Sequence, residues 1–396
     1  MTAAELGIAV IGLGWMGEVH ARAFLRVGHH FPRLKPRPRL VAAADPVPER
    51  AEAAGRRYGF ERVSATWRDL LDDPRVQAVS ITTPNHLHHE IGVAMARAGK
   101  HIWIEKPVGR NSAEVRAVAA ATAEAGVRST VGFNYRHVPA VAQARSMLEQ
   151  GRIGAPTHAR FRLLSDYAAH PRGALSWRFK RALGGSGALG DLASHGVDLV
   201  RHLLGEIDSV VADQAVFIPE RPEPAAVSSH FAVAAGGALA RVENEDYVGC
   251  LLRLAGGARV VLEASRVSVG EQCNYGFEIH GGEGALSWDF RRMGELGVCV
   301  GDTYQNQSVA TVLAGPGQGA FEAFQPAAGI AMGFDDLKVI EAADFLRSVG
   351  EGGPRGPTID DAVRAAEVAD AIAESVRTGA WVRVLLQRAT STISNE

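Results

Sequence analysis

One stretch of the chain combines acidic and imidazole side chains at helical spacing. A glycine-rich loop at 184–190 precedes Asp191, His195, Asp198 and His202. At about 100° per residue, these offsets place all four on one stripe of a helix. The opposite side carries apolar residues: Leu192, Val197, Leu199, Val200, Leu203 and Leu204. Such a helix can hold a proton acceptor rigidly beside a substrate. The alternative is a stripe facing water, which the scarcity of Lys, Glu and Gln there disfavours.

The chemistry that suits these groups is proton removal during oxidation of an alcohol. A secondary alcohol that loses hydride must also lose a proton, and histidine titrates near neutral pH. We therefore expect His195 to be the base and Asp191 to bind substrate or orient the imidazole. Lys106 would polarise the reacting oxygen, although a solvated surface lysine is the alternative. Ser186 lacks the Gly-x-Ser-x-Gly spacing, which argues against a serine hydrolase.

A glycine fingerprint near the start of the chain predicts where the hydride acceptor binds. Gly12, Gly14 and Gly17, with Trp15 and Met16 among them, follow an apolar strand and open a helical pattern. Glycines in that context let the backbone approach the pyrophosphate of a dinucleotide at a helix N-terminus. Because nicotinamide carries the redox step, no metal is needed.

Asp45 ends the second predicted strand and indicates which dinucleotide binds. A carboxylate there accepts hydrogen bonds from the adenosine ribose and repels a 2′-phosphate, which favours NAD, with NADP as the second possibility. The alternative is a turn or helix-cap Asp before Pro46.

Further cofactor contacts are expected where the third and fourth strands end, because ligands of open α/β sheets bind at that edge. The expected contacts are Thr83, Pro84, Asn85, His88, Glu105 and Lys106. The histidine-rich segment 86–89 lacks acidic or thiol partners at matching spacing, so we expect no metal site.

Alternating strand and helix patterns must position these groups. Strands are predicted at 7–11, 40–44, 78–82, 101–104 and 127–131. Their alternation with helical stretches predicts a parallel, doubly wound α/β sheet, a Rossmann domain spanning residues 1–132. The proline-rich segment 27–39 is expected to be an inserted loop.

The remaining residues, 133–396, are predicted to form a substrate-binding and oligomerisation domain. Strand patterns at 157–164, 247–254, 258–267 and 275–280 follow one another with few helices between them, which predicts an α+β domain with a large antiparallel sheet. Helices are expected after Gly190 and over 359–378. Segments 218–241 and 301–329 are expected to be loops or excursions.

Composition excludes several other classes of protein. Among 396 residues, 42 basic and 44 acidic ones are mixed along the chain, which argues against nucleic-acid and anionic-membrane partners. The three cysteines are too few for a disulfide framework and are expected to be reduced thiols. The first apolar stretch, 8–16, lacks a basic leader and contains two glycines, so we expect a cytoplasmic protein.

Taken together, these motifs resemble the glucose-fructose oxidoreductase and inositol dehydrogenase family, Gfo/Idh/MocA. The resemblance rests on segments 10–17, 83–85, 105–107, 134–136 and 187–195. It implies a Rossmann domain, a C-terminal domain with an open antiparallel sheet, and a homodimer or homotetramer formed through that sheet. It also implies that Lys106, Asp191 and His195 are catalytic and that Asn134 contacts substrate.

Segment 175–180 and the proline-rich segment look most like the levoglucosan dehydrogenase and glycoside 3-dehydrogenase branch of this family. Trp177 would then line a sugar pocket, although a core tryptophan is an equal alternative. The implied substrate is a pyranose, anhydrosugar, glycoside or inositol. Two other functions stay open: cleavage of a glycosidic bond through transient oxidation, and a nicotinamide-binding sensor without catalytic activity.

Overall fold

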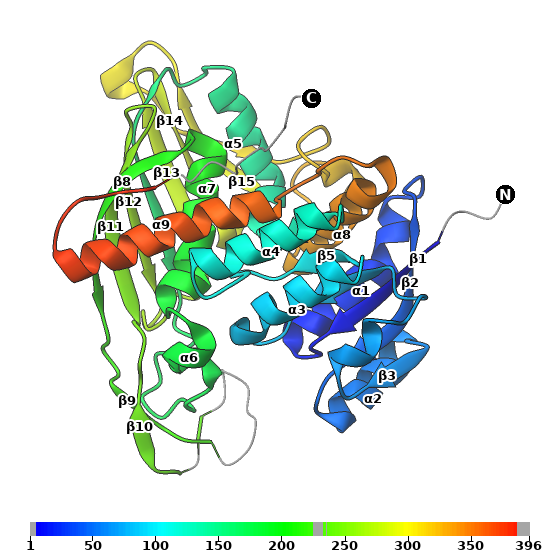
Figure 1. The fold of residues 1–396 in the computed structure, drawn as a ribbon. Helices are drawn as coiled ribbons and strands as arrows, with labels where there is room; N and C mark the ends of the chain where they lie inside the picture. The colour runs from blue at the N-terminus through cyan, green and yellow to red at the C-terminus, as the bar shows by residue number, and fades with distance from the viewer. Residues whose placement is uncertain (1–4, 225–232, 235, 386–396) are drawn as a thin grey trace, which may run out of the picture.

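The computed structural model describes residues 5–224, 233, 234 and 236–385 (Figure 1). Within this part of the chain, two sheets lie on either side of a set of helices. None of the helices in the described residues combines the length and apolar character that spanning a bilayer requires.

The N-terminal sheet is a six-stranded parallel sheet in the order β3-β2-β1-β4-β5-β6. Its strands are β1 Glu5–Ile11, β2 Arg37–Ala44, β3 Arg62–Ser64, β4 Ala78–Ile81, β5 His101–Ile104 and β6 Ser129–Val131. Its helices are α1 Trp15–His30, α2 Pro48–Tyr58, α3 Asn85–Arg97 and α4 Ser112–Glu124. The strand order reverses between β1 and β4, the position where doubly wound sheets bind ligands. The doubly wound sheet predicted from sequence is therefore confirmed.

The expected loop at 27–39 is largely wrong. Helix α1 continues to His30 and β2 begins at Arg37, so only residues 31–36 connect them. Pro38 is tolerated inside β2 because it lies near the start of the strand, where a missing ladder hydrogen bond costs little.

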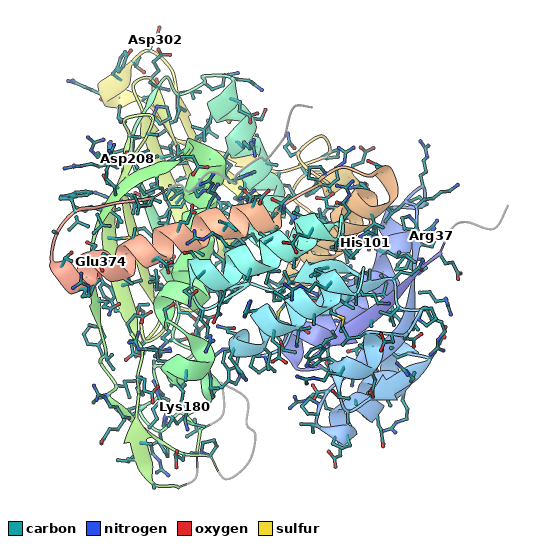
Figure 2. All side chains as sticks on the ribbon, viewed as in Figure 1. Arg37, His101, Lys180, Asp208, Asp302 and Glu374 are labelled. Atoms are coloured by element: carbon teal, nitrogen blue, oxygen red, sulfur yellow. The ribbon has the colours of Figure 1, made fainter. Side chains whose placement is uncertain are left out.

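The C-terminal sheet has nine strands in the order β16-β15-β14-β13-β7-β12-β11-β8-β17. They are β7 Pro156–Leu164, β8 Ile207–Ala215, β11 Tyr247–Leu254, β12 Arg259–Ser265, β13 Asn274–Gly281, β14 Gly284–Asp289, β15 Glu295–Val300, β16 Ala310–Leu313 and β17 Val382–Arg383. Every neighbouring pair is antiparallel except β7 with β12, so the predicted antiparallel sheet is confirmed with one parallel pair. Asp302 and Lys180 mark opposite ends of this region in Figure 2.

Both segments expected to be excursions contain strands. Residues 218–241 include β9 Glu220–Pro222 and β10 Leu239–Arg241, which pair with each other, while 225–232 and 235 lie outside the described residues. Segment 301–329 contains β16, which extends the large sheet at its edge.

The remaining helices connect the two sheets. They are α5 Pro139–Glu149, α6 Arg181–Gly184, α7 Ser194–Leu204, α8 Phe334–Glu351 and α9 Ile359–Thr378. Helix α9 lies between α4 and β8 (Figure 1). Helix α8 packs against α1 and shares one apolar core with the N-terminal sheet, through Val339, Ala342 and Phe345. The C-terminal part of the chain therefore returns to the N-terminal sheet, and the boundary after residue 132 stays a prediction.

Candidate active site

The glycine fingerprint lies at the carboxyl end of β1, where its shape requires glycine. Gly12 has a φ of 87°, and a Cβ on Gly17 would lie 2.0 Å from the carbonyl oxygen of Gly12. A Cβ on Gly14 would meet nothing within 4 Å, and no side chain caps the N-terminus of α1. The loop therefore leaves open backbone beside a positive helix end, as a pyrophosphate requires. Trp15 stacks on Phe334 at 5.4 Å between ring centres, so its ring contacts α8.

Asp45 is buried at the end of β2, where it binds the glycine loop. Its Oδ2 accepts a hydrogen bond from the Leu13 amide at 2.7 Å, and its Oδ1 accepts one from the Val47 amide at 2.9 Å. The turn role considered as the alternative is therefore present. Oδ2 also accepts from the Arg50 guanidinium, whereas Oδ1 keeps a second acceptor position, so ribose binding by Asp45 is compatible with these bonds. Arg50 lies 3.4 Å from Oδ2.

The segment after β4 supplies one open donor and one fully engaged histidine. The hydroxyl oxygen of Thr83 is buried and has no hydrogen-bond partner in the described part of the chain. Pro84 precedes α3, and Asn85 donates to the carbonyl of Gly184 at 2.9 Å. Both ring nitrogens of His88 lie within 2.8 Å of carbonyl oxygens, those of Pro107 and Thr83. His88 therefore joins two loops, and its direct contact with the cofactor stays a prediction.

Glu105 is also held by protein groups. One carboxylate oxygen, Oε1, accepts from His20 Nε2 at 3.0 Å and from Lys338 Nζ at 2.5 Å. The other, Oε2, accepts from the Lys106 amide at 3.3 Å. Burial opposes ionisation of Glu105, but the charge of Lys338 and the hydrogen bond from His20 hold its pKa below the usual range. Glu105 therefore supports the Lys106 backbone, and its contact with the cofactor stays a prediction.

Lys106 and Asp191 meet as predicted, although they lie far apart in sequence. Lys106 Nζ donates to Asp191 Oδ1 at 3.1 Å and to the Asp191 carbonyl at 2.8 Å. The Tyr167 hydroxyl donates to Asp191 Oδ2 at 2.6 Å. Burial opposes ionisation of Asp191, but the charges of Lys106 and Arg178 hold its pKa well below the usual range. The result is a fixed ammonium group with a fixed counterion at the edge of the sheet.

His195 lies beside this pair in an aromatic enclosure. It is 7% exposed, and its ring centre is 4.6 Å from that of Tyr135. Burial, followed by the charge of Lys106, lowers the pKa of His195 well below its usual value. Within the described residues, Nδ1 has no hydrogen-bond partner. The imidazole is therefore neutral near pH 7, the state in which it can accept a proton.

The predicted polar stripe is only partly correct. The segment Leu189–Ala193, η4, is a π-helical turn, so the spacing of 100° per residue does not apply before α7. Asp198 is buried and forms two hydrogen bonds to Arg136, at 2.8 and 2.5 Å. His202 lies 2.8 Å from Arg145. These last two residues of the stripe therefore serve packing between helices, whereas Asp191 and His195 face the site.

A small pocket adjoins Asp191, and it includes residues that sequence reasoning missed. Trp177, Arg178, Asn85 and Tyr167 line it together with Asp191. The guanidinium of Arg178 lies over the Trp177 ring at 4.3 Å. Tyr167 follows strand β7 and has no motif of its own, whereas Arg178 lies in segment 175–180, of which only Trp177 was predicted to line the site. Only their position at the end of a strand or loop beside the site could have indicated them.

Asn134, expected to contact substrate, lies in the short helix η2 (Asn134–His137) beside Phe133 and Tyr135. It is 2% exposed, and its Nδ2 has no hydrogen-bond partner among the described residues. A buried amide donor without a partner carries an energetic cost unless a ligand accepts from it. This observation keeps Asn134 as a candidate ligand contact.

Comparison with known proteins supports this interpretation. A model described as "Oxidoreductase family, NAD-binding Rossmann fold" matches residues 6–133, and one described as "GFO/IDH/MocA C-terminal domain" matches residues 141–287. The chain is 38% identical to levoglucosan dehydrogenase of Pseudarthrobacter phenanthrenivorans over 96% of this chain and 98% of that protein. It is 26% identical to inositol 2-dehydrogenase of Rhizobium meliloti over 93% of this chain and 96% of that protein.

Solved structures agree with these sequence matches. A levoglucosan dehydrogenase in complex with NADH and levoglucosan superimposes with a TM-score of 0.90 at 38% identity, covering 96% of this chain and 99% of that one. An NAD-binding oxidoreductase from Klebsiella pneumoniae has a TM-score of 0.89 at 35% identity, covering 97% of this chain and 100% of that one. The predicted resemblance is confirmed.

Proposed function

Because this chain belongs to the GFO/IDH/MocA family of NAD-binding oxidoreductases, we propose that it oxidises a secondary hydroxyl group of levoglucosan or a closely related pyranose. The observation that carries the proposal is the ion pair of Lys106 and Asp191 at the carboxyl edge of the N-terminal sheet, with the neutral imidazole of His195 beside it. A sensor without activity would not need a neutral, enclosed imidazole beside a fixed ammonium group.

The groups that would hold NAD are at the carboxyl edge of the N-terminal sheet. Gly12, Gly14 and the first turn of α1 would receive the pyrophosphate, and Asp45 would receive the adenosine ribose. The hydroxyl of Thr83, which has no hydrogen-bond partner among the described residues, and the ammonium of Lys106 would bind the nicotinamide half. Bound NAD would supply the hydride acceptor.

The chain itself would handle the proton and the developing negative charge. His195 accepts the hydroxyl proton, because its imidazole is neutral near pH 7. The ammonium of Lys106 stabilises the oxygen as its negative charge develops. Asp191 holds that ammonium in place and is itself held by Tyr167. Trp177 and Asn134 would contact the sugar.

The proposal is tested by assaying levoglucosan, other anhydrosugars, pyranoses, glycosides and inositols with NAD and with NADP, following the absorbance of reduced cofactor. We expect the largest kcat/KM with an anhydrosugar and NAD. Turnover of inositols alone would overturn the substrate assignment. Product analysis distinguishes a released ketose from a cleaved glycoside.

We further propose that the chain forms a homodimer or homotetramer in the cytoplasm. The three cysteines are unpaired, which suits a reducing compartment. The oligomer would form through the uncovered face of the nine-stranded sheet.

A further inference from the structure

Behind the Lys106 loop lies a cluster of buried charged groups. It consists of His20 on α1, Glu105 after β5, and Lys338 and Glu341 on α8, all at most 6% exposed. Lys338 Nζ lies 2.5 Å from Glu105 Oε1 and 2.8 Å from Glu341 Oε2. Ion pairs this deeply buried must be well compensated, because desolvation of each ion is costly. Packing alone therefore does not explain why these charged groups lie in the core.

The acidic and imidazole groups also have the spacing of a metal site. Ligand atoms of His20, Glu105 and Glu341 lie within 4.8 Å of one another. The ammonium of Lys338 already lies between the ionised Glu105 and the carboxyl group of Glu341, however, and supplies the positive charge that a cation would bring. Lys338 is thus the counterion of this cluster.

The hydrogen bonds of Glu105 have one consistent assignment. A carboxylate only accepts, so His20 Nε2 carries the proton it shares with Glu105, and His20 Nδ1 accepts from the Ser80 hydroxyl at 2.7 Å. The His20 ring is fixed further by stacking on Trp103, with centres 3.7 Å apart. Lys338 and His20 therefore hold Oε1 from two directions.

The second carboxylate oxygen leads to the active site. Oε2 accepts from the backbone amide of Lys106, and the side chain of that same residue reaches Asp191. A Cβ on Gly132 would lie 2.4 Å from Glu105 Oε1, so the carboxylate packs tightly against that backbone. Rotation of Glu105 would thus disturb the residue that carries the catalytic ammonium.

We infer that Lys338 is a positioning residue for Lys106. It lies on a helix 233 residues away from Glu105 and acts through the Glu105 carboxylate. Lys338 keeps that carboxylate ionised and oriented, and the carboxylate fixes the backbone from which the Lys106 ammonium reaches Asp191. The inference rests on the proposed role of Lys106. It gives α8 a function in the active site in addition to its packing against the N-terminal sheet.

Glu341 offers a matched control inside the same cluster. Burial raises the pKa of Glu341 to about 8 in spite of the neighbouring Lys338, so at neutral pH its side chain is mostly a neutral acid. Glu341→Gln should reproduce that state. Glu341 makes no contact with Lys106 among the described residues.

The test compares Lys338→Met, Glu105→Gln, their double variant and Glu341→Gln. We expect Lys338→Met to lower kcat roughly 10- to 100-fold, as displacement of a catalytic group by about 1 Å does, while NADH affinity changes less than about threefold. Glu105→Gln should lower kcat similarly, and the double variant should lose little more, because both act through one carboxylate. Glu341→Gln should keep kcat at pH 7.

A crystal structure of Lys338→Met separates this inference from the assignment of the substrate. We expect Glu105 Oε2 to leave the Lys106 amide and Lys106 Nζ to leave Asp191, whatever substrate is turned over. An unmoved Lys106 would overturn the inference, as would an equal kcat loss in Glu341→Gln. If Lys338→Met does not fold, Glu105→Gln and its crystal structure decide the same question.

Discussion

At the scale of single residues, burial sets the protonation states that the reaction needs. His195 is kept neutral by burial and by the nearby Lys106 charge, whereas Asp191 is kept ionised by Lys106 and Arg178 against the effect of burial. The ammonium of Lys106 therefore lowers the pKa of both Asp191 and His195. In the proposed mechanism it keeps His195 able to accept a proton, and it pairs with Asp191, which holds the ammonium in place.

This arrangement predicts an unusually flat pH profile. The neutral form of His195 is the active one, and its pKa is lowered, so kcat/KM should hold through neutral pH and fall only at clearly acidic pH.

His195→Ala should lower kcat by roughly two to four orders of magnitude, the usual effect of removing a general base. NADH affinity, measured by fluorescence titration, should remain near that of the native protein.

Near-native turnover in His195→Ala, with an unchanged pH profile, would place the base elsewhere. Lys106 would then be the leading candidate. His202→Ala is a suitable control, since His202 contacts Arg145 on another helix and lies outside the site.

Asp45 should determine the choice between NAD and NADP. Its carboxylate repels a 2′-phosphate, and Arg50 lies 3.4 Å from it. Asp45→Ser should remove the repulsion and free Arg50 to bind phosphate, raising kcat/KM with NADP by roughly tenfold, or about 1.4 kcal/mol. Asp45→Asn keeps an acceptor for the Leu13 amide and isolates the effect of charge. A native enzyme that prefers NADP would contradict this assignment.

The proposed catalytic residues could be singled out from the sequence because each lies in a local motif, but the residues that contact and hold them could not. Tyr167 and Lys338 contact the site from segments without a motif, and Arg178 lies in segment 175–180, of which only Trp177 was predicted to line the site. His88 and Glu105 lie where a cofactor contact is expected, yet their polar atoms are engaged by groups that fold back from elsewhere. A motif predicts where a residue lies along a strand or helix, whereas its hydrogen-bond partners depend on tertiary contacts.

At the scale of helices and strands, one arginine ties three elements together. Arg136, in the short helix η2, binds Asp198 on α7 and Asp361 at the start of α9. The Arg136 side chain is 12% exposed, and that of Asp198 is 2% exposed. Since α7 carries His195, this contact also fixes the helix that presents the base.

Arg136→Met should therefore destabilise the protein by about 3–5 kcal/mol, because it leaves the Asp198 carboxylate buried without a counterion. Chemical denaturation measures the change in unfolding free energy. Arg355→Met provides the control, since Arg355 pairs with Glu351 near the surface and its loss should cost at most about 1 kcal/mol. Equal losses in the two variants would contradict the structural role of Arg136.

Elements with strong local patterns were predictable, and those defined by tertiary contacts were not. The expected helix at 359–378 is α9 to the residue, and the expected strands at 101–104 and 247–254 are β5 and β11. Strand β8 was not predicted, and helix α8 was missed although its sequence has helix signals, with Asp335 and Asp336 in the first turn and Gly352 after the last turn. The π-helical turn at Leu189–Ala193 was missed because its sequence reads as an ordinary helix start.

At the scale of the whole molecule, the two large sheets differ in how their faces are covered. The N-terminal sheet is buried on both faces, whereas the nine-stranded sheet buries one face against α7 and α9 and leaves the other uncovered (Figure 1). On the uncovered face, Leu251 pairs with Val261 across β11 and β12, and these side chains are 49% and 43% exposed. Arg160 pairs with Val261 on the next strand, β7, so the apolar residues have a charged border.

An apolar centre with a charged border is typical of a protein interface, which supports self-association through this face. We expect light scattering at micromolar concentration to give a dimer or tetramer mass. Val261→Glu should lower that mass, because it brings two like charges together across a symmetric interface. Val269→Glu, at an exposed position in the loop before β13, is the matched control and should leave the mass unchanged. A monomer mass for the native chain would refute the oligomer, and dissociation by both variants would place the interface elsewhere.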